Sequence, residues 1–207
     1  MTFVLAPAWR RPVLAESFLP SALTRAGVTV VLGAALTAFA AQVAVPIPGS
    51  PVPVTGQTFA VLVTAAALGP ARGLASQALY LVLGLLGLPV FAQAQHGTQA
   101  VFGATGGYLV GFLVAALIAG RGARLGADRS PWRALPLMVL ASASIYLVGA
   151  SWLAFSTGMS AAQTMAAGVV PFLLGDALKV LLAAGLLPSA WRLLNRVERN
   201  AENGQGR

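Results

Sequence analysis

Long apolar stretches recur through the chain, and nearly every charged residue lies in the short segments between them. Charged residues make up only 9% of the 207 residues, whereas a soluble domain usually carries about 25%. So few charges cannot cover a water-soluble surface, and we therefore expect lipid to surround the fold. The sequence predicts an all-α integral membrane protein built as one compact helical bundle.

The apolar stretches predict six transmembrane helices. The second and third are short, because a hydrocarbon core about 30 Å thick needs roughly 20 residues. Short helices are tolerated where irregular backbone at their ends is buried in protein or lines a cavity. A Pro-rich stretch, 46–53, excludes a helix between the first two spans, and with loop 89–105 it would roof a cavity in the outer half of the bundle. The predicted helices cover residues 27–45, 57–68, 74–88, 106–119, 135–155 and 171–191.

The arginines all fall on one side of the membrane if the chain begins in the cytoplasm. The thirteen basic residues are Lys179 and twelve arginines, and with six spans the three outward connections contain neither type. Because positive residues favour the cytoplasmic side, we predict that both termini are cytoplasmic. Residues 1–22 would form a lead, 23–192 the membrane domain and 193–207 a tail. The net charge of +8 therefore indicates topology, and no nucleic-acid partner is expected.

Asp176 and Lys179 are the two acidic or basic residues that lie clearly within a predicted span. They are three residues apart and share one helix face. A charge near the bilayer centre costs at least about 2.5–3.5 kcal/mol, so such residues usually mark a ligand or ion path. An acceptor and a cation together suit a ligand with N–H donors at one end and a carboxylate at the other. The alternative is an ion pair that only orients the helix.

Two polar segments at the outer face are further candidates for the binding site. Thr105, Gly106, Gly107 and Tyr108 open the fourth span, where free backbone N–H groups and a partial positive charge could hold a carboxylate or polar ring. The alternative is an N-cap followed by small packing residues. Gln57 opens the second span and can both donate and accept hydrogen bonds, or it is an interfacial amide facing water.

The sequence contains few residues that could support catalysis or bind a metal ion. Cysteine is absent and His96 is the sole histidine, so we expect no metal site and no cofactor. An enzyme would need a nucleophile with a base, a metal or clustered carboxylates, and the spans hold one acid. The chain also lacks a phosphate-binding loop of the G-x-x-x-x-G-K-[ST] type, so any ATP-driven step would belong to partners.

The first predicted span carries small residues at three- and four-residue spacing. Such a stripe lets another helix approach closely, and that helix could belong to the same bundle or to another protein. The stripe consists of Gly33, Ala34, Thr37, Ala38 and Ala41.

Four segments together resemble the BioY family, the biotin-specific substrate-binding subunits (S components) of energy-coupling factor (ECF) transporters. The similarity lies in PIPGSPVPVTGQT at 46–58, YLVLGLLGLPVFA at 80–92, TGGYLVGF at 105–112 and GDALK at 175–179. The segments follow the family's order and span about residues 28–190. Two departures are Ala104, where the family usually has proline, and loop 93–97, which reads QAQHG.

The resemblance implies an S-component-like bundle in the bacterial plasma membrane that binds biotin from outside. It implies that Asp176 holds the ureido N–H groups and Lys179 the carboxylate, or the reverse, and that the opening of the fourth span shares the carboxylate. It also places Gln93 among the substrate-binding residues. Ala34 and Ala38 would meet a transmembrane coupling subunit, which works with a pair of ATPases.

Three alternatives remain at this point. An S component for another small vitamin would share the fold and differ in its cavity residues. A stand-alone biotin facilitator would need no ATPase, and the small-residue stripe could then serve contacts in a homo-oligomer. A membrane enzyme is disfavoured for lack of catalytic groups.

Overall fold

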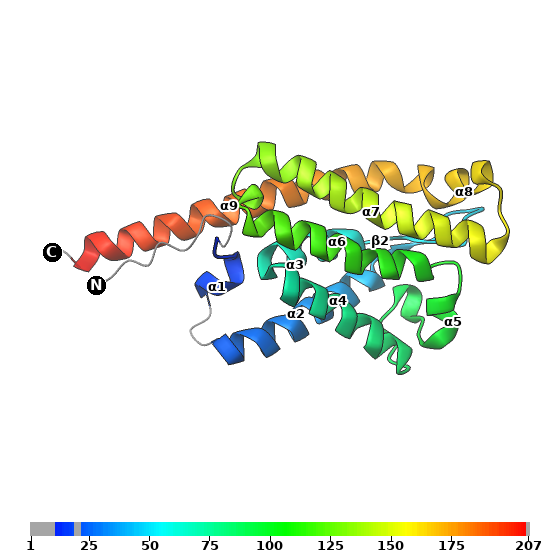
Figure 1. The fold of residues 1–207 in the computed structure, drawn as a ribbon, viewed down its shortest axis with the longest axis horizontal. Coiled ribbons are helices and arrows are strands. Elements are labelled where there is room, and N and C mark those ends of the chain that lie inside the picture. The colour runs from blue at the N-terminus through cyan, green and yellow to red at the C-terminus, as the bar shows by residue number, and fades with distance from the viewer. Residues whose placement is uncertain (1–10, 19–21, 206–207) are drawn as a thin grey trace.

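The computed structural model describes residues 11–18 and 22–205, and nearly all of this part of the chain is helical (Figure 1). The longer helices are α2 (Ala22–Gln42), α3 (Gln57–Leu68), α4 (Pro70–Leu85), α6 (Gly106–Arg124), α7 (Pro131–Thr157) and α9 (Leu173–Gln205). Shorter helical elements are α1 (Leu14–Phe18), η1 (Ala92–Ala94), α5 (Gly97–Phe102), η2 (Ala127–Arg129), α8 (Ala161–Gly168) and η3 (Val170–Phe172). The strands are β1 (Ala44–Val45) and β2 (Val54–Thr55).

Each predicted apolar stretch overlaps one of the longer helices. The bounds of α3 are those predicted, whereas α6 and α9 continue well past their apolar parts. Helix α4 begins at Pro70, earlier than predicted, because proline is tolerated in the first turn of a helix. Within the described residues, stretches 106–124, 131–157 and 161–197 are long and apolar enough to cross a membrane. Shorter apolar helices cover Ala26–Gln42 and Gln57–Leu68.

Helix α3 lies at the centre of the bundle. It contacts α2, α4, α6 and α9, while α7 packs against both α6 and α9 (Figure 1). Most α3 residues are buried, including Val61 and Leu62 at 0% exposure. A central position explains why this helix can be short, because neighbouring helices rather than lipid surround its ends.

Small residues set the close packing of α6 on α7. Ala115, Ala116 and Ala119 are fully buried, and a Cβ atom added at Gly111 would meet the backbone of Ile145 at 2.9 Å. Small side chains at a helix interface allow the two backbones to approach. The glycine and alanine content of this span therefore serves packing.

The Pro-rich stretch forms a hairpin at one end of the bundle, called here the hairpin end. Strands β1 and β2 pair antiparallel, with Ala44 opposite Thr55. The Ser50 hydroxyl donates to the carbonyl of Ala167 at 2.7 Å, so the hairpin tip is tied to the end of α8. The stretch is non-helical, as the prolines predict.

The opposite end, called the basic end, carries Arg72, Arg124 and Glu16. The Arg124 guanidinium donates to both carboxylate oxygens of Glu16, at 2.7 and 2.5 Å, and Arg72 lies 3.5 Å from the same carboxylate. Val13 and Leu14, beside Glu16, are buried. Residues 11–18 of the predicted lead therefore pack against the bundle, whereas residues 1–10 and 19–21 lie outside the described part.

Two further side chains join distant segments at the basic end. The Trp191 indole N–H donates to Asp128 at 2.6 Å, and the Arg129 guanidinium lies 4.1 Å from the centre of the Trp191 ring. Burial raises the pKa of Asp128 above its ordinary value, although the Trp191 hydrogen bond and the Arg129 charge act in the opposite direction. These contacts fix α9 against η2 where α9 leaves the bundle.

Candidate substrate-binding site

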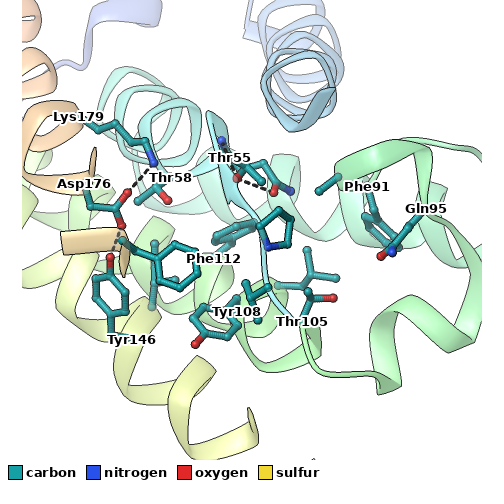
Figure 2. A pocket seen from close by; sticks show the side chains of 17 residues that line it. Thr55, Thr58, Phe91, Gln95, Thr105, Tyr108, Phe112, Tyr146, Asp176 and Lys179 are labelled. Atoms are coloured by element: carbon teal, nitrogen blue, oxygen red, sulfur yellow. Dashed lines mark hydrogen bonds and ion pairs between the residues drawn. The ribbon is translucent and has the colours of Figure 1, made fainter. Parts of the chain in front are cut away.

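A narrow cavity lies towards the hairpin end, between β2, the first turns of α6 and α9, and the middle of α7 (Figure 2). Its volume is about 60 Å³, which holds only a few water molecules. The cavity brings together five residues predicted for the site. They are Gln57, Thr105, Tyr108, Asp176 and Lys179.

The charged end of the cavity is formed by Asp176, Lys179 and Tyr146. The Lys179 ammonium donates to Asp176 Oδ1 at 2.6 Å, and the Tyr146 hydroxyl donates to Asp176 Oδ2 at 2.5 Å (Figure 2). Asp176 is only 8% exposed, and both of its carboxylate oxygens have a partner. The predicted shared helix face is confirmed. The sequence did not indicate Tyr146, because a single tyrosine in an apolar span carries no distinguishing pattern.

Gln57 belongs to the cavity wall and has partners for its side-chain nitrogen and oxygen. Its Nε2 donates to the Tyr80 hydroxyl at 2.6 Å, and its Oε1 accepts from the Thr55 hydroxyl at 2.9 Å. Gln57 is 5% exposed and Tyr80 is fully buried. The amide is therefore held in one orientation facing the cavity, so it is not a free interfacial group.

The ring of Tyr108 lines the cavity, whereas its hydroxyl is already hydrogen-bonded to the protein. That hydroxyl donates to the carbonyl of Gly168 at 2.7 Å. Figure 2 shows the ring beside Phe112, with Thr105 nearby. The Thr105 hydroxyl donates to the carbonyl of Ala100 at 3.2 Å. At this position α6 supplies an aromatic wall with one hydroxyl at its edge.

Gly106 and Gly107 do not line the cavity. A Cβ atom at Gly106 would collide with the carbonyl of Val101, and one at Gly107 would collide with Trp152. The two glycines let α6 pack closely against its neighbours. This placement matches the alternative of small packing residues that the sequence left open.

Gln93 also lies outside the cavity. Its side chain is exposed and lines a separate surface hollow with His96 and Gln99, whereas Gln95 lines the cavity. The backbone at Gln93 has φ 58° and ψ 33°, a left-handed conformation that the sequence did not predict. This turn is what separates the directions of Gln93 and Gln95.

The predicted partner contacts on α2 point inward. Ala34 is 2% exposed and belongs to the core, while Ala38 is half-buried. The outward face of α2 instead carries larger apolar side chains, among them Leu32 at 61% and Phe39 at 74% exposure. Apart from the half-buried Ala38, the small-residue stripe is buried within this bundle.

The cavity has two chemically different ends. Figure 2 shows Asp176, Lys179 and Tyr146 at one end, Gln95 and Phe91 at the other, and Phe112 between them. Within the described residues no cluster of His, Cys, Asp or Glu could hold a metal ion. The arrangement suits an elongated organic molecule with polar groups at its ends and an apolar middle.

The BioY family model matches residues 13–196. The chain is a member of the BioY family. Curated relatives include the probable biotin transporter BioY of Pyrococcus horikoshii, 40% identical over 154 residues that make up 74% of this chain and 88% of the relative. Another is the biotin transporter BioY of Thermotoga maritima, 38% identical over 140 residues, or 67% and 80% of the two chains. Both relatives are named as biotin transporters, so this is a family of transport proteins rather than of enzymes.

A solved structure has the same fold. The crystal structure of the S-component for biotin from an ECF-type ABC transporter matches with a TM-score of 0.76 at 23% identity, covering 82% of this chain and 92% of that one. The fold of the present chain is therefore that of an ECF S component. Together with its apolar helices, the family makes the chain a multi-pass membrane protein.

Proposed function

We propose that the chain is the biotin-binding membrane subunit of an ECF-type vitamin uptake transporter. It captures biotin from outside a bacterial plasma membrane. The observation that carries the proposal is the Asp176–Lys179 pair lining a cavity at the hairpin end of an S-component fold. The names of the BioY relatives support biotin as the ligand.

The proposed topology has six spans with both termini in the cytoplasm, so the hairpin end faces outward. It is supported by the sequence of the connections at that end: residues 43–56, 86–105 and 158–172 contain no Lys or Arg. The basic end carries Arg72, Arg121, Arg124 and Arg129. This distribution follows the preference of positive residues for the cytoplasmic side.

Biotin has a ureido ring at one end and a carboxylate at the other, with an apolar ring and chain between. In the proposed complex, Asp176 accepts from the ureido N–H groups and Lys179 neutralises the carboxylate. Because these two side chains are 2.6 Å apart, they must separate when the ligand binds. Lys179 has the longer and more flexible chain, so we expect it to move while Tyr146 keeps Asp176 in place. The reverse assignment of the two ends is the alternative.

The proposed partners are a transmembrane coupling subunit and a pair of ATPases. This chain has no phosphate-binding loop of its own, and the S-component fold supports such an assembly. Because Ala34 is buried, the coupling subunit can reach it only if α2 shifts, and Ala38 is the more accessible of the two proposed contacts. A stand-alone facilitator or homo-oligomer remains the alternative assembly.

Calorimetric titration of the detergent-purified protein tests the ligand and its orientation together. The ligands are biotin and its primary amide, in which the carboxylate is neutralised, and the proteins are the wild type and Lys179→Ala. If Lys179 binds the carboxylate, Lys179→Ala weakens biotin binding at least about tenfold and the amide much less, because an ionic hydrogen bond contributes about 1.5–3 kcal/mol. Equal losses for both ligands would reverse the assignment. A folded wild type that binds neither ligand would refute biotin as the substrate, and other vitamins would then be titrated.

A further inference from the structure

A second hollow lies beside the cavity on the outer surface of the hairpin end. It is lined by Gln93, Ala94, Gln95, His96, Gln99 and Ala100. Gln95 lines both the hollow and the cavity, at the end of the cavity opposite Asp176 (Figure 2). The two spaces therefore share one side chain, which is itself exposed.

The hollow offers hydrogen-bonding groups without charge. Within the described part of the chain, the side-chain amides of Gln93, Gln95 and Gln99 make no hydrogen bond to protein. His96 Nδ1 lies 3.3 Å from the carbonyl oxygen of Ala94. Three amides that both donate and accept are complementary to a group that does the same, such as a cyclic urea.

The backbone holds these amides in an uncommon conformation. Gln93 and Ala94 have φ values of 58° and 57°, both in the left-handed region that residues with a side chain seldom adopt. The turn is fastened by backbone bonds between Phe91 and Gln95, at 3.1 Å, and between Gln95 and Ala92, at 3.2 Å. Phe91 is itself 3% exposed and packs edge-on against Tyr80. Two successive residues held in the left-handed conformation direct Gln93 towards the hollow and leave Gln95 at its boundary.

Charge cannot guide a ligand at this surface. The connections at the hairpin end, 43–56, 86–105 and 158–172, contain no Asp, Glu, Lys or Arg, and His96 is the one histidine among them. Electrostatic steering needs such charges. Hydrogen bonds from neutral side chains are therefore the interactions through which this surface can orient an arriving ligand.

We infer that the hollow is a transit site, which holds the ureido ring of the ligand briefly before the ring passes Gln95 into the cavity. The inference rests on the proposed function. The ureido ring must lead if it is to reach Asp176 at the far end of the cavity. The same ring then meets the amides of Gln93 and Gln99 first, and these amides are left behind once the ligand is seated.

A transit site has a kinetic signature that a contact in the bound state lacks. If the ring keeps its contacts with Gln93 and Gln99 while it passes Gln95, those contacts stabilise the transition state for binding, and the same transition state is crossed on release. Removing those contacts lowers the association and dissociation rate constants by the same factor and leaves Kd unchanged. Losing a contact in the final complex mainly raises the dissociation rate constant.

The test is stopped-flow binding of biotin to the full-length purified protein, with release followed by chase. The variants are Gln99→Ala and the pair Gln93→Ala with Gln99→Ala. The control is Thr98→Ala, which is exposed on the same short helix and does not line the hollow. We expect both rate constants of the double variant to fall about 2- to 13-fold, the range of one neutral hydrogen bond, with Kd within twofold of the wild type.

Unchanged rates in both variants, or a Kd that rises through faster dissociation, would overturn the transit site. Gln99→Ala keeps the inference testable if the double variant does not fold, because Gln99 lies in α5 and not in the left-handed turn. Absence of biotin binding by the wild type is a different result, which refutes the proposed function itself.

Discussion

The two ends of the bundle each contain an ion pair, and the pairs differ in what they connect. At the hairpin end, Lys179 binds Asp176 three residues away on the same helix. At the basic end, Arg124 binds Glu16, which is 108 residues away in the chain. A pair within one helix turn fastens nothing beyond that helix, so a ligand can replace it without loosening the fold. A pair between distant segments restrains the fold, and opening it releases a segment.

The surroundings of the two pairs differ in the same way. The Asp176–Lys179 pair lines a cavity, whereas α1 and the buried side chains of Val13 and Leu14 lie beside Glu16. We propose that the Asp176–Lys179 pair is placed for exchange with a ligand and the Arg124–Glu16 pair for stability.

The largest expected effect is on biotin binding in Asp176→Asn. The asparagine keeps the shape of the side chain but loses the charge that accepts from Tyr146, Lys179 and the proposed ureido group. Loss of an ionic hydrogen bond costs about 1.5–3 kcal/mol, so we expect Kd to rise roughly 10- to 150-fold. Calorimetric titration of the purified variant measures it.

Asp176→Asn also leaves Lys179 without its partner, which could lower stability by itself. The double variant Asp176→Asn with Lys179→Met removes both charges and serves as the control. If the single variant melts near the temperature of this double variant and of the wild type, the loss of affinity belongs to the site. Wild-type affinity in a folded Asp176→Asn protein would contradict the placement of the ligand.

The next effect in size is on stability in Glu16→Gln, with biotin affinity unchanged. The variant loses the charge that Arg124 contacts through two nitrogen atoms. Because the Arg124 side chain is 28% exposed, solvent weakens the pair and we expect a loss of about 1 kcal/mol. Thermal unfolding in detergent measures the loss, and titration with biotin measures Kd. A changed Kd with unchanged stability would reverse the roles assigned to the two ends.

Arg124→Lys is the matched companion variant. It keeps the positive charge and loses the planar fork that contacts both carboxylate oxygens. We expect its melting temperature to fall between those of the wild type and Glu16→Gln. A lysine variant as stable as the wild type would show that charge alone, without the two-point contact, fastens residues 11–18.

The sequence predicted the positions of the longer helices well, because the placement of apolar runs follows from a strong physical cost. Apolar runs and arginine placement are set by the membrane, and a charge inside a span needs a reason. The same argument singled out Asp176 and Lys179, but the sequence did not indicate whether they contact each other, and the structure places them 2.6 Å apart. The family resemblance, carried by short ordered segments, is confirmed by the match to residues 13–196.

The sequence could not predict which way individual side chains point. Ala34 belongs to a stripe that equally suits an internal or an external neighbour, and it is buried. Gln93 and Gln95 are two residues apart, and only a left-handed turn decides which one reaches the cavity. Residues 11–18 have mixed composition, so the burial of Val13 was not foreseen. Each of these depends on long-range packing that no local pattern encodes.

A smaller effect on affinity is expected from Tyr146→Phe at the hairpin end. The variant removes one hydroxyl that donates to Asp176 and keeps the ring in the cavity wall. A hydrogen bond to a charged group contributes about 1.5–3 kcal/mol. Because this one is present with and without the ligand, only part of it affects binding, and we expect Kd to rise about 2- to 10-fold. Tyr108→Phe is the control, because its hydroxyl donates to the carbonyl of Gly168 instead. Equal effects of the two variants on Kd would contradict the proposal that Tyr146 positions Asp176.

The smallest expected effect is the pH dependence of the stability gap between the wild type and Glu16→Gln. Partial burial acts to raise the pKa of Glu16, but the hydrogen bond and charge of Arg124 outweigh it and hold that pKa below the ordinary 4.5. A carboxyl group with a lowered pKa in the fold stabilises the protein above its unfolded pKa. This contribution is lost as pH falls through the folded value.

The gap in melting temperature should therefore be constant near neutral pH and narrow only as pH falls below about 4.5. Asp128, whose pKa is raised by burial, changes the stability of both proteins equally and cancels in the difference. Thermal unfolding of the two proteins in parallel from pH 7 to pH 3.5 measures the gap. A gap that stays constant over this whole range would show that Glu16 contributes through packing or neutral hydrogen bonds and not through its charge. The Arg124–Glu16 pair would then not stabilise the fold through its charges, and the contrast with the Asp176–Lys179 pair would fail.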